Sequence, residues 1–390
     1  MLLLLFCLLI AASLAFGAPV VELVNISNVR LRRDRRGEMM DIHDGNILSI
    51  TDSETGAVVY HYYGMAYHNC TIQHSWFPPR WCPGIYEPFG QCGFRTDHMI
   101  RLYTSPDLHS WTLGSENVLP LNRRPYGIYF RPKVIFCPTT SKYVLWVNYL
   151  PNASSPLAAF PNAKLLVATS ATIDGPFEVL HHADGLGHHG PGDFTLMVVS
   201  FAPGDSRAYI AYGAWSTDHT ISIEQLDENF TNSLGLKRSS GLLSPPGNEA
   251  PILFHRRGFF YLIFGECCCF CQQGAGATVY VASSPLGPWN TTMGSLGTVD
   301  INPVLNESTR VISSQNNYVF QIPSAAGGGK AAAYVWMGDR WASAHDGLFG
   351  HNLQSWHLLE FDGEGLRGSA PSIRELTWED WFLLNVTTSV

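Results

Sequence analysis

The sequence contains little charge and, beyond its first residues, no long hydrophobic run. Only 14% of its 390 residues are charged, and the formal net charge is −8. The one dense basic cluster, RLRRDRR at 30–36, is too small for the basic surface that nucleic-acid binding requires. No apolar segment after residue 18 is long enough to span a membrane as a helix. We therefore expect neither a nucleic-acid nor a membrane partner for the mature protein.

Common catalytic and metal-binding signatures are also missing. The chain has no Gly-x-Ser-x-Gly nucleophile elbow and no His-Glu-x-x-His motif, and its nine cysteines match no zinc-binding spacing. The histidine-rich stretch HHADGLGHHG at 181–190 is more typical of an exposed loop than of a metal site. The sequence thus predicts no resident metal and argues against serine hydrolases and zinc peptidases.

The first 18 residues, MLLLLFCLLIAASLAFGA, have the apolar core and terminal small residues of a secretory signal. We expect cleavage there, leaving a single domain at 19–390 that is secreted and monomeric. Loss of Cys7 leaves eight cysteines, an even number suited to disulfide bonds; the candidates are Cys70, Cys82, Cys92, Cys137 and the cluster at 267–271. Seven N-glycosylation sequons agree with an extracellular glycoprotein, at Asn25, Asn69, Asn152, Asn229, Asn290, Asn306 and Asn385.

A pattern of short apolar segments recurs five times along the chain. Aromatic-rich runs end at Gly64, Tyr149, Gly213, Gly265 and Gly338. Each follows a shorter run (NILSI, KVIF, FTLMVV, PILF or NYVFQI), and each precedes a third that closes on Trp111, Phe177, Phe230, Trp289 or Trp356. Closing aromatics roughly 50–70 residues apart indicate one blade per repeat. The pattern predicts an all-β fold, a five-bladed β-propeller of four-stranded blades over about 40–360, closed by the segment to 390.

Polar residues stand at the start of the innermost strand in four of these repeats: Asp44, Asp193, Glu249 and Gln315. The second repeat offers Phe130 and Arg131 instead. Innermost strands line the axis of a propeller, so these side chains should converge at one mouth. Two facing carboxyl groups suit cleavage of a glycosidic bond, with one as acid and the other as nucleophile or base. A third carboxylate would raise the pKa of the acid by repulsion between like charges.

The stretch DRRGEMMDIHDGNIL at 34–48 resembles the opening pattern of glycoside hydrolase family 43, in its exo-β-1,3-galactanase branch. The motifs RPKV at 131–134, EAP at 249–251, SSQ at 313–315 and GDRW at 338–341 agree with that branch in order along the chain. The resemblance covers most of the mature chain. It implies a five-bladed propeller, as the repeats do.

The resemblance implies a role for each catalytic candidate. Glu249 matches the general acid, and Asp193 matches the carboxylate that tunes and orients that acid. Gln315 matches an amide that stands in this branch where a base is expected. Asp44 matches the general base of the wider family, at a position where this branch commonly has glycine. We expect hydrolysis with inversion, in which either Asp44 or Gln315 handles the water.

Substrate contacts are expected from residues beside these positions: His43, Phe130, Arg131, Trp215, Asp339, Arg340 and Trp341. Phe130 departs from the branch, which usually has a glutamate there that would contact a sugar hydroxyl. The resemblance also allows a structural cation on the propeller axis, with His345 as a contributor, and no other cofactor.

The sequence therefore predicts a secreted glycoside hydrolase that acts on a galactan-type polysaccharide or oligosaccharide. Two alternatives stay open. Phe130 and an unfamiliar insertion at 65–95 would suit a carbohydrate-binding propeller without turnover. Asp44 would suit an arabinosidase or xylosidase of the same family.

Overall fold

The computed structural model describes residues 20–52, 55–68, 95–151, 160–183, 185–266, 274–291, 295–297, 299–302, 307–310, 313–324, 331–341, 343–364 and 370–388. Several predicted features lie outside these residues. They are the signal at 1–18, most of the insertion at 65–95, every cysteine except Cys137, and the sequons at Asn69, Asn152 and Asn306.

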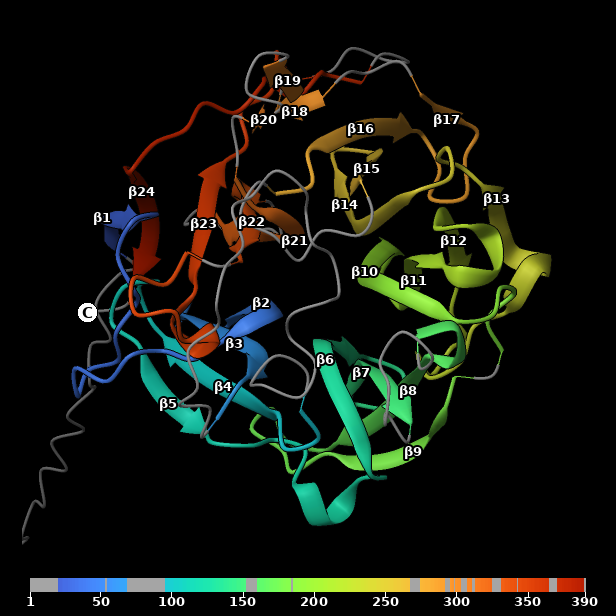
Figure 1. Ribbon diagram of the computed structural model, residues 1–390, viewed down its shortest axis with the longest axis horizontal. Coiled ribbons are helices and arrows are strands. Elements are labelled where there is room, and N and C mark those ends of the chain that lie inside the picture. The colour runs from blue at the N-terminus through green and yellow to red at the C-terminus, as the bar shows by residue number, and fades with distance from the viewer. Residues whose placement is uncertain are drawn as a thin grey trace, which may run out of the picture.

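Five antiparallel sheets form a ring, which confirms the predicted five-bladed β-propeller (Figure 1). Blade 1 contains β2 (His43–Thr51), β3 (Val58–Ala66), β4 (Met99–Ser105) and β5 (Thr112–Ser115). Blade 2 contains β6 (Gly127–Cys137), β7 (Lys142–Pro151), β8 (Lys164–Ser170) and β9 (Glu178–His182). Blade 3 contains β10 (Pro191–Ala202), β11 (Asp205–Ala214), β12 (Thr220–Gln225) and β13 (Ser239–Leu242).

Blades 4 and 5 depart from the four-stranded pattern. Blade 4 contains β14 (Asn248–Arg256), β15 (Phe259–Glu266), β16 (Ala277–Ala282), β17 (Trp289–Asn290) and β18 (Ser295–Gly297), which also pairs with β16. In the described part of blade 5 there are three strands, β21 (Gln315–Pro323), β22 (Ala331–Arg340) and β23 (Leu353–Leu358). Two further pairs join β1 (Val20–Ser27) to β24 (Trp381–Thr388) and β19 (Val299–Asn302) to β20 (Glu307–Arg310).

Helical structure among the described residues is limited to short 3₁₀ turns. These are η1 (Leu121–Arg123), η2 (Phe160–Asn162), η3 (Trp215–Thr217), η4 (Gly235–Arg238) and η5 (Phe349–His351). Within the residues described, the structure contains no helix with the length and apolar character needed to cross a bilayer.

The hydrophobic core lies in the seams between neighbouring blades. Successive side chains of a strand point to opposite faces, so one strand supplies two seams. In β7, for example, Val144 and Trp146 pack toward blade 3, whereas Leu145 and Val147 pack toward blade 1. The predicted closing aromatics Trp111, Phe177, Phe230 and Trp356 are all buried in these seams. Packing between blades therefore fixes the relative positions of the inner strands.

The ring closes where the β1–β24 pair lies beside blade 5 at the edge of the molecule (Figure 1). Asn28, fully buried just after β1, takes the place of a fourth strand. Its Oδ1 accepts a hydrogen bond from Trp356 N at 2.8 Å, and its Nδ2 donates to Trp356 O at 2.9 Å. One amide side chain thus satisfies both backbone groups of a β23 residue, which explains why blade 5 needs no further strand there.

Cys137 is a buried free thiol, so its proposed part in a disulfide bond was wrong. Its Sγ lies 3.5 Å from Glu228 O, in the seam between blades 2 and 3, where a small apolar side chain packs well.

We predict that Asn28→Ala lowers the free energy of unfolding by about 2–4 kcal/mol, because it leaves the N–H and C=O of Trp356 buried without partners. Urea denaturation followed by tryptophan fluorescence would measure the change. Glu22→Ala, an exposed position on β1, is the control and should stay within about 0.5 kcal/mol of wild type. Equal stabilities for the two variants would show that Asn28 does not close the ring.

Candidate active site

Each of the five inner strands begins with an irregularity in its pairing. The register shifts lie at 43–46 in β2, 130–133 in β6, 191–194 in β10, 249–252 in β14 and 316–318 in β21. A β-bulge bends its strand and re-aims the side chain that it carries. The polar residues predicted to converge therefore sit on these bulges or directly beside them, at one end of the ring.

Three of these bulges hold a residue in the left-handed backbone region: Asp44 (φ 56°), Arg131 (φ 51°) and Ala250 (φ 52°). Such conformations are unfavourable for residues other than glycine. Next to Asp44, a Cβ on Gly45 would lie 1.6 Å from Tyr63 O, so only glycine allows β2 to approach β3 this closely. The strained turns are retained because the packed seams hold the strands on both sides.

Arg131 links three other blades through one buried guanidinium, which is 1% exposed. Its Nε lies 2.8 Å from Asp193 Oδ1, and its Nη2 lies 2.9 Å from Asp44 Oδ1. The same Nη2 donates to Gln315 Oε1 at 3.1 Å, and Nη1 donates to Asn316 O at 3.2 Å. Burial alone would lower the pKa of Arg131, but the charges of Asp193 and Asp44 raise it above its usual value. The group is a permanent cation between two carboxylates.

The amide of Gln315 uses all of its main hydrogen-bonding positions within the protein. Its Nε2 donates to Glu249 Oε1 at 2.6 Å and to Asp193 Oδ2 at 3.2 Å. Its Oε1 accepts from Arg131 and, at 2.8 Å, from Trp341 Nε1. The amide oxygen faces two donors and the amide nitrogen faces two acceptors, which defines the orientation of the amide. All four predicted catalytic residues, Asp44, Asp193, Glu249 and Gln315, thus belong to one cluster.

A further carboxyl group, that of Asp339 in blade 5, contacts Asp44. Asp339 Oδ1 accepts a hydrogen bond from Asp44 N at 3.2 Å, and Asp339 is 1% exposed. Burial, reinforced by the charge of Asp44, raises the pKa of Asp339 to about 6. Burial also raises the pKa of Asp44, although Arg131 opposes the shift. Both carboxyl groups therefore hold a proton to a higher pH than an exposed aspartate.

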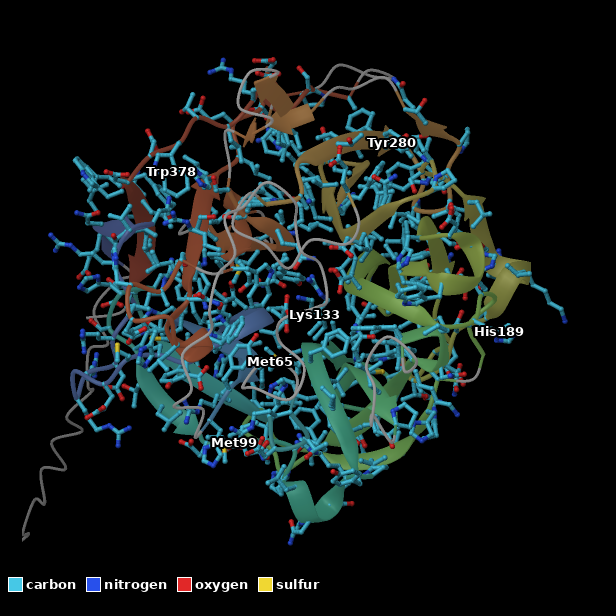
Figure 2. All side chains as sticks on the ribbon, viewed as in Figure 1. Met65, Met99, Lys133, His189, Tyr280 and Trp378 are labelled. Carbon is cyan, nitrogen blue, oxygen red and sulfur yellow. The ribbon has the colours of Figure 1, made fainter. Side chains whose placement is uncertain are left out.

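Lys133, which lies near the centre of the ring (Figure 2), was not among the predicted site residues. It is fully buried, and its Nζ donates to Asp44 O at 3.0 Å, to Gly45 O at 2.7 Å and to Asn317 Oδ1. Burial and the neighbouring Arg131 lower its pKa well below the usual value. The ammonium holds the backbone of the Asp44 bulge, and a lysine inside the apolar run of β6 was the sequence signal for it.

His43 is completely buried behind the cluster. Its Nε2 lies 3.4 Å from Asp41 Oδ1, and its ring lies 5.4 Å from Tyr67 and 6.0 Å from Trp341, between ring centroids. Burial would lower the pKa of His43, but Asp41 outweighs it and the pKa is raised. His43 therefore packs against Trp341 in the interior and does not face open solvent.

An aromatic wall borders the cluster on the side of blades 2 and 3. Phe130, 6% exposed, packs in the same apolar group as Trp341 and lies 6.4 Å from Phe160 between ring centroids. Phe160 stacks on Trp215 at 5.9 Å and 24°. Trp215 also makes an edge contact with His219 at 4.5 Å. The wall is built largely by packing among its own members.

Arg340 lies away from this cluster, on the other face of β22. Its Nη1 donates to Asn28 O at 2.7 Å, and its guanidinium stacks over Trp378 at 4.6 Å. Alternation along the strand explains this, because Asp339 and Trp341 face the site and the residue between them faces the β1–β24 pair. The geometry gives Arg340 a part in ring closure and does not support the predicted substrate contact.

Within the described residues, no group of three or more His, Cys, Asp or Glu side chains is arranged to hold a metal ion. The polar centre already contains two buried cationic side chains, Arg131 and Lys133, against its carboxylates. His345 is exposed. These residues do not fit a structural cation on the axis, so no step below uses one.

A bladed ring with clustered carboxyl groups at one mouth is the architecture of a propeller glycosidase. Residues 88–321 match the model of the glycosyl hydrolases family 43, which is more than half of the chain. The chain therefore belongs to glycosyl hydrolase family 43 and is, by family, a glycoside hydrolase. This confirms the resemblance seen in its motifs. No curated protein sequence matches the chain.

Solved structures with the same fold include exo-β-1,3-galactanases. The enzyme of Phanerochaete chrysosporium with β-1,3-galactotriose is 22% identical, with a TM-score of 0.65, over 93% of this chain and 69% of that one. The enzyme of Clostridium thermocellum is 20% identical, with a TM-score of 0.65, over 94% and 68%. A family 43 β-1,3-galactosidase is 21% identical, with a TM-score of 0.64. The match covers 93% of this chain but only 64% of that protein, which is less than two thirds of its length.

We predict that Asp339→Asn changes how stability depends on pH. The folded-state pKa of Asp339 is raised to about 6, so the wild type loses stability as pH rises from the unfolded pKa, near 4, through about 6. The variant keeps an acceptor for Asp44 N without the buried charge. It should therefore gain on the order of 3 kcal/mol over wild type at pH 7 and nothing at pH 3.5.

Urea denaturation of both proteins between pH 3.5 and 7.5 would measure the difference. Glu228→Gln, at an exposed carboxylate, is the matched control and should track the wild type throughout. A variant that is less stable than wild type at pH 7 would show that the Asp339 carboxylate is stabilised, not penalised, in its site.

Proposed function

We propose that the protein hydrolyses β-1,3-linked galactan chains with inversion, with Glu249 as the general acid. The observation that supports this assignment is the 2.6 Å hydrogen bond from Gln315 Nε2 to Glu249 Oε1. It connects Glu249 to the network of Asp193 and Arg131. The galactanase structures support the sugar, because they share the fold and one of them contains β-1,3-galactotriose.

Glu249 is suited to proton donation by its position. It lies at the start of β14 and is 9% exposed, so it is largely shielded yet reachable from the mouth. The acid gives its proton to the glycosidic oxygen as the bond to the anomeric carbon breaks. Asp193 shares the Gln315 amide with Glu249, so the amide holds the two carboxyl groups side by side and orients the acid.

Asp44 is favoured over Gln315 as the group that activates water. Gln315 has both oxygen and nitrogen engaged with protein groups, and an amide is a poor base. Asp44 Oδ1 lies 2.9 Å from Arg131 Nη2 but accepts no hydrogen bond within the described residues, so this carboxyl group is less engaged than the amide. Burial raises the pKa of Asp44, which makes its carboxylate a stronger base. In this assignment Gln315 positions Glu249 and Asp193.

The alternatives from the sequence remain testable against this proposal. Asp44 would equally serve an arabinosidase or xylosidase of the family. The burial of Phe130 among other aromatic side chains leaves blade 2 without a polar sugar contact at that position, as a binding protein without turnover would tolerate.

We also propose that the protein is a secreted, monomeric glycoprotein. All four described sequon asparagines, Asn25, Asn229, Asn290 and Asn385, are exposed, as glycan attachment requires. The apolar segment at 1–18 supports export.

We predict that Glu249→Gln lowers kcat on β-1,3-galactotriose by about 10²–10⁴, because the substitution keeps the shape but removes the acid. Galactose release by chromatography would measure it, beside arabinose- and xylose-containing oligosaccharides. Glu228→Gln is the control and should leave kcat unchanged. Release of arabinose or xylose instead of galactose would identify a different substrate. Binding without any release by the wild type would establish the carbohydrate-binding alternative.

We predict that Asp44→Asn also lowers kcat by about 10²–10⁴ and that azide restores turnover in this variant. Azide attacks without needing a base, and inversion would give the α-galactosyl azide. Gln315→Ala should lose activity without azide rescue, because it disturbs the acid rather than the base. Proton NMR of the first product would give its anomeric form. Rescue of Gln315→Ala but not of Asp44→Asn would assign the base to the amide.

A further inference from the structure

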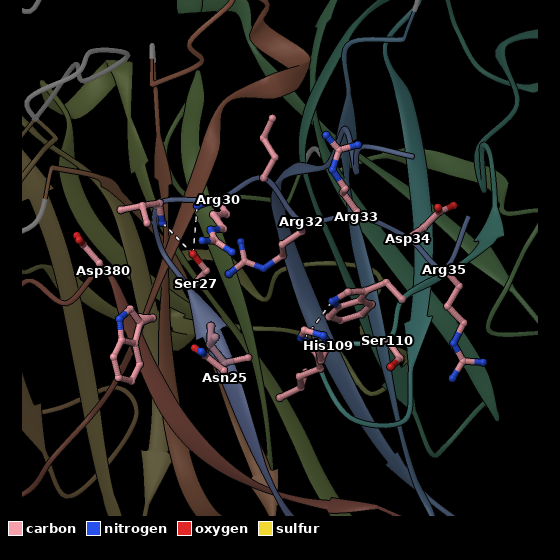
Figure 3. Close-up of a pocket in the computed structure, with 16 residues that line it drawn as sticks. Asn25, Ser27, Arg30, Arg32, Arg33, Asp34, Arg35, His109, Ser110 and Asp380 are labelled. Atoms are coloured by element: carbon pink, nitrogen blue, oxygen red, sulfur yellow. Dashed lines mark hydrogen bonds between the residues drawn. The ribbon is translucent and has the colours of Figure 1, made fainter. Parts of the chain in front are cut away.

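A groove of about 800 Å³ lies beside the β1–β24 pair, which stands at the edge of the ring in Figure 1. Figure 3 shows the groove, and none of the carboxylate cluster lines it. It is lined by residues 25–35, 108–111 and 380–381, so it lies between the β1–β24 pair and the turn before β5 of blade 1. The groove contains most of the basic run at 30–36, which is the one dense cationic segment of the sequence. No residue of this run belongs to the carboxylate cluster of the candidate active site.

Positive charge in the groove exceeds negative charge. Four arginines line it, Arg30, Arg32, Arg33 and Arg35, together with two aspartates, Asp34 and Asp380. Asp34 is already neutralised, because its Oδ2 lies 3.1 Å from Arg36 Nε and its Oδ1 accepts two backbone N–H groups. Asp380 Oδ1 accepts from Trp378 Nε1 at 2.9 Å. Both carboxylates are therefore engaged, whereas much of the cationic charge is not.

Arg30 and Arg35 are exposed, and neither guanidinium has an ion pair or hydrogen bond within the described part of the chain. Arg33 donates only to the backbone, to Gly37 O at 2.7 Å. In Figure 3 the guanidinium ends of Arg30 and Arg32 point toward each other. Like charges that line one groove repel, and an anion placed there would relieve that repulsion.

Arg32 supplies a fixed charge at the base of the groove. Its guanidinium lies 3.9 Å above the Trp356 ring, and its Nη1 donates to Gln354 O and Oε1, each at 3.3 Å. Its Nη2 is buried without a hydrogen-bond partner in the structure. Burial lowers the pKa of Arg32 to about 10, which leaves it charged at neutral pH. A charge held this way cannot turn away to solvent, so it acts on whatever occupies the groove.

Sugar-binding chemistry stands beside these cations. Trp381 lines the groove with 58% of its surface exposed, and an exposed indole face can stack on a sugar ring. Ser110 lines the groove as well and can hydrogen-bond to hydroxyl groups. We propose that the groove binds an anionic saccharide, with carboxylate or sulfate groups on Arg30 and Arg35 and a sugar ring on Trp381. The biological role of this groove rests on the proposed function, since binding there would hold the enzyme on an acidic polymer.

Isothermal titration calorimetry would test the groove with three probes: oligogalacturonate, a heparin oligosaccharide and neutral β-1,3-galactotriose. We expect one of the two anionic probes to bind the wild type, and Arg30→Ala/Arg35→Ala to weaken that binding at least tenfold. Trp381→Ala should weaken it several-fold. Arg123→Ala/Arg207→Ala removes equal charge at two arginines outside the groove and should bind as wild type does. All proteins come from one expression host, so any glycan on Asn25 is common to them.

The outcomes separate this proposal from the proposed function. Hydrolysis of β-1,3-galactotriose should be the same in wild type and Arg30→Ala/Arg35→Ala. Groove-dependent binding by a wild type that cleaves no galactan would support the groove and sink the hydrolase assignment. Cleavage without binding of either anionic probe, or binding that the two double variants weaken equally, would overturn the groove. A further outcome concerns single-stranded DNA. If the wild type bound this DNA as tightly as the saccharide, and Arg30→Ala/Arg35→Ala lost both kinds of binding equally, the assignment of the groove to saccharides would be overturned.

Discussion

The contact between Arg131 and the carboxylates around it is the interaction on which the mouth of the propeller depends. The guanidinium reaches Asp44 of blade 1, Asp193 of blade 3 and Gln315 of blade 5 from its own place in blade 2. Gln315 then connects Glu249 of blade 4, so one cation organises side chains from all five blades. A planar group with five donors can do this, whereas a lysine ammonium could not match the separate acceptors. Removing it would leave buried carboxylates uncompensated, which is far more costly than losing an exposed ion pair.

The same arrangement explains why the fold tolerates strain at its mouth. Left-handed conformations at Asp44, Arg131 and Ala250 cost on the order of 1–3 kcal/mol each. The seams between blades provide the opposing stabilisation, since Trp146, Trp336 and Trp356 are buried almost completely in them. Because each seam is shared by two blades, a bulge cannot relax without disturbing its neighbour. Rigid packing at the periphery therefore maintains an unfavourable but well-defined geometry at the axis.

The five inner strands and their convergence could be predicted because both depend on local patterns, namely alternation within a strand and a repeat of the same segment. Features that depend on one long-range contact could not. The replacement of a strand by Asn28 requires knowing that residues 28 and 356 meet, and the free thiol of Cys137 requires knowing its seam. Arg340 is a different case. Its opposite orientation to Asp339 and Trp341 follows from strand periodicity alone and was available in the sequence.

The two candidate bases are not independent, because Arg131 Nη2 contacts both Asp44 Oδ1 and Gln315 Oε1. A negative charge on Asp44 draws this donor toward itself, whereas a protonated Asp44 leaves more of it for Gln315. Both groups therefore depend on one donor, and Gln315 in turn donates to Glu249. An aspartate at this position is thus more than a spare base. It belongs to the same charged and hydrogen-bonded network as Gln315 and Glu249.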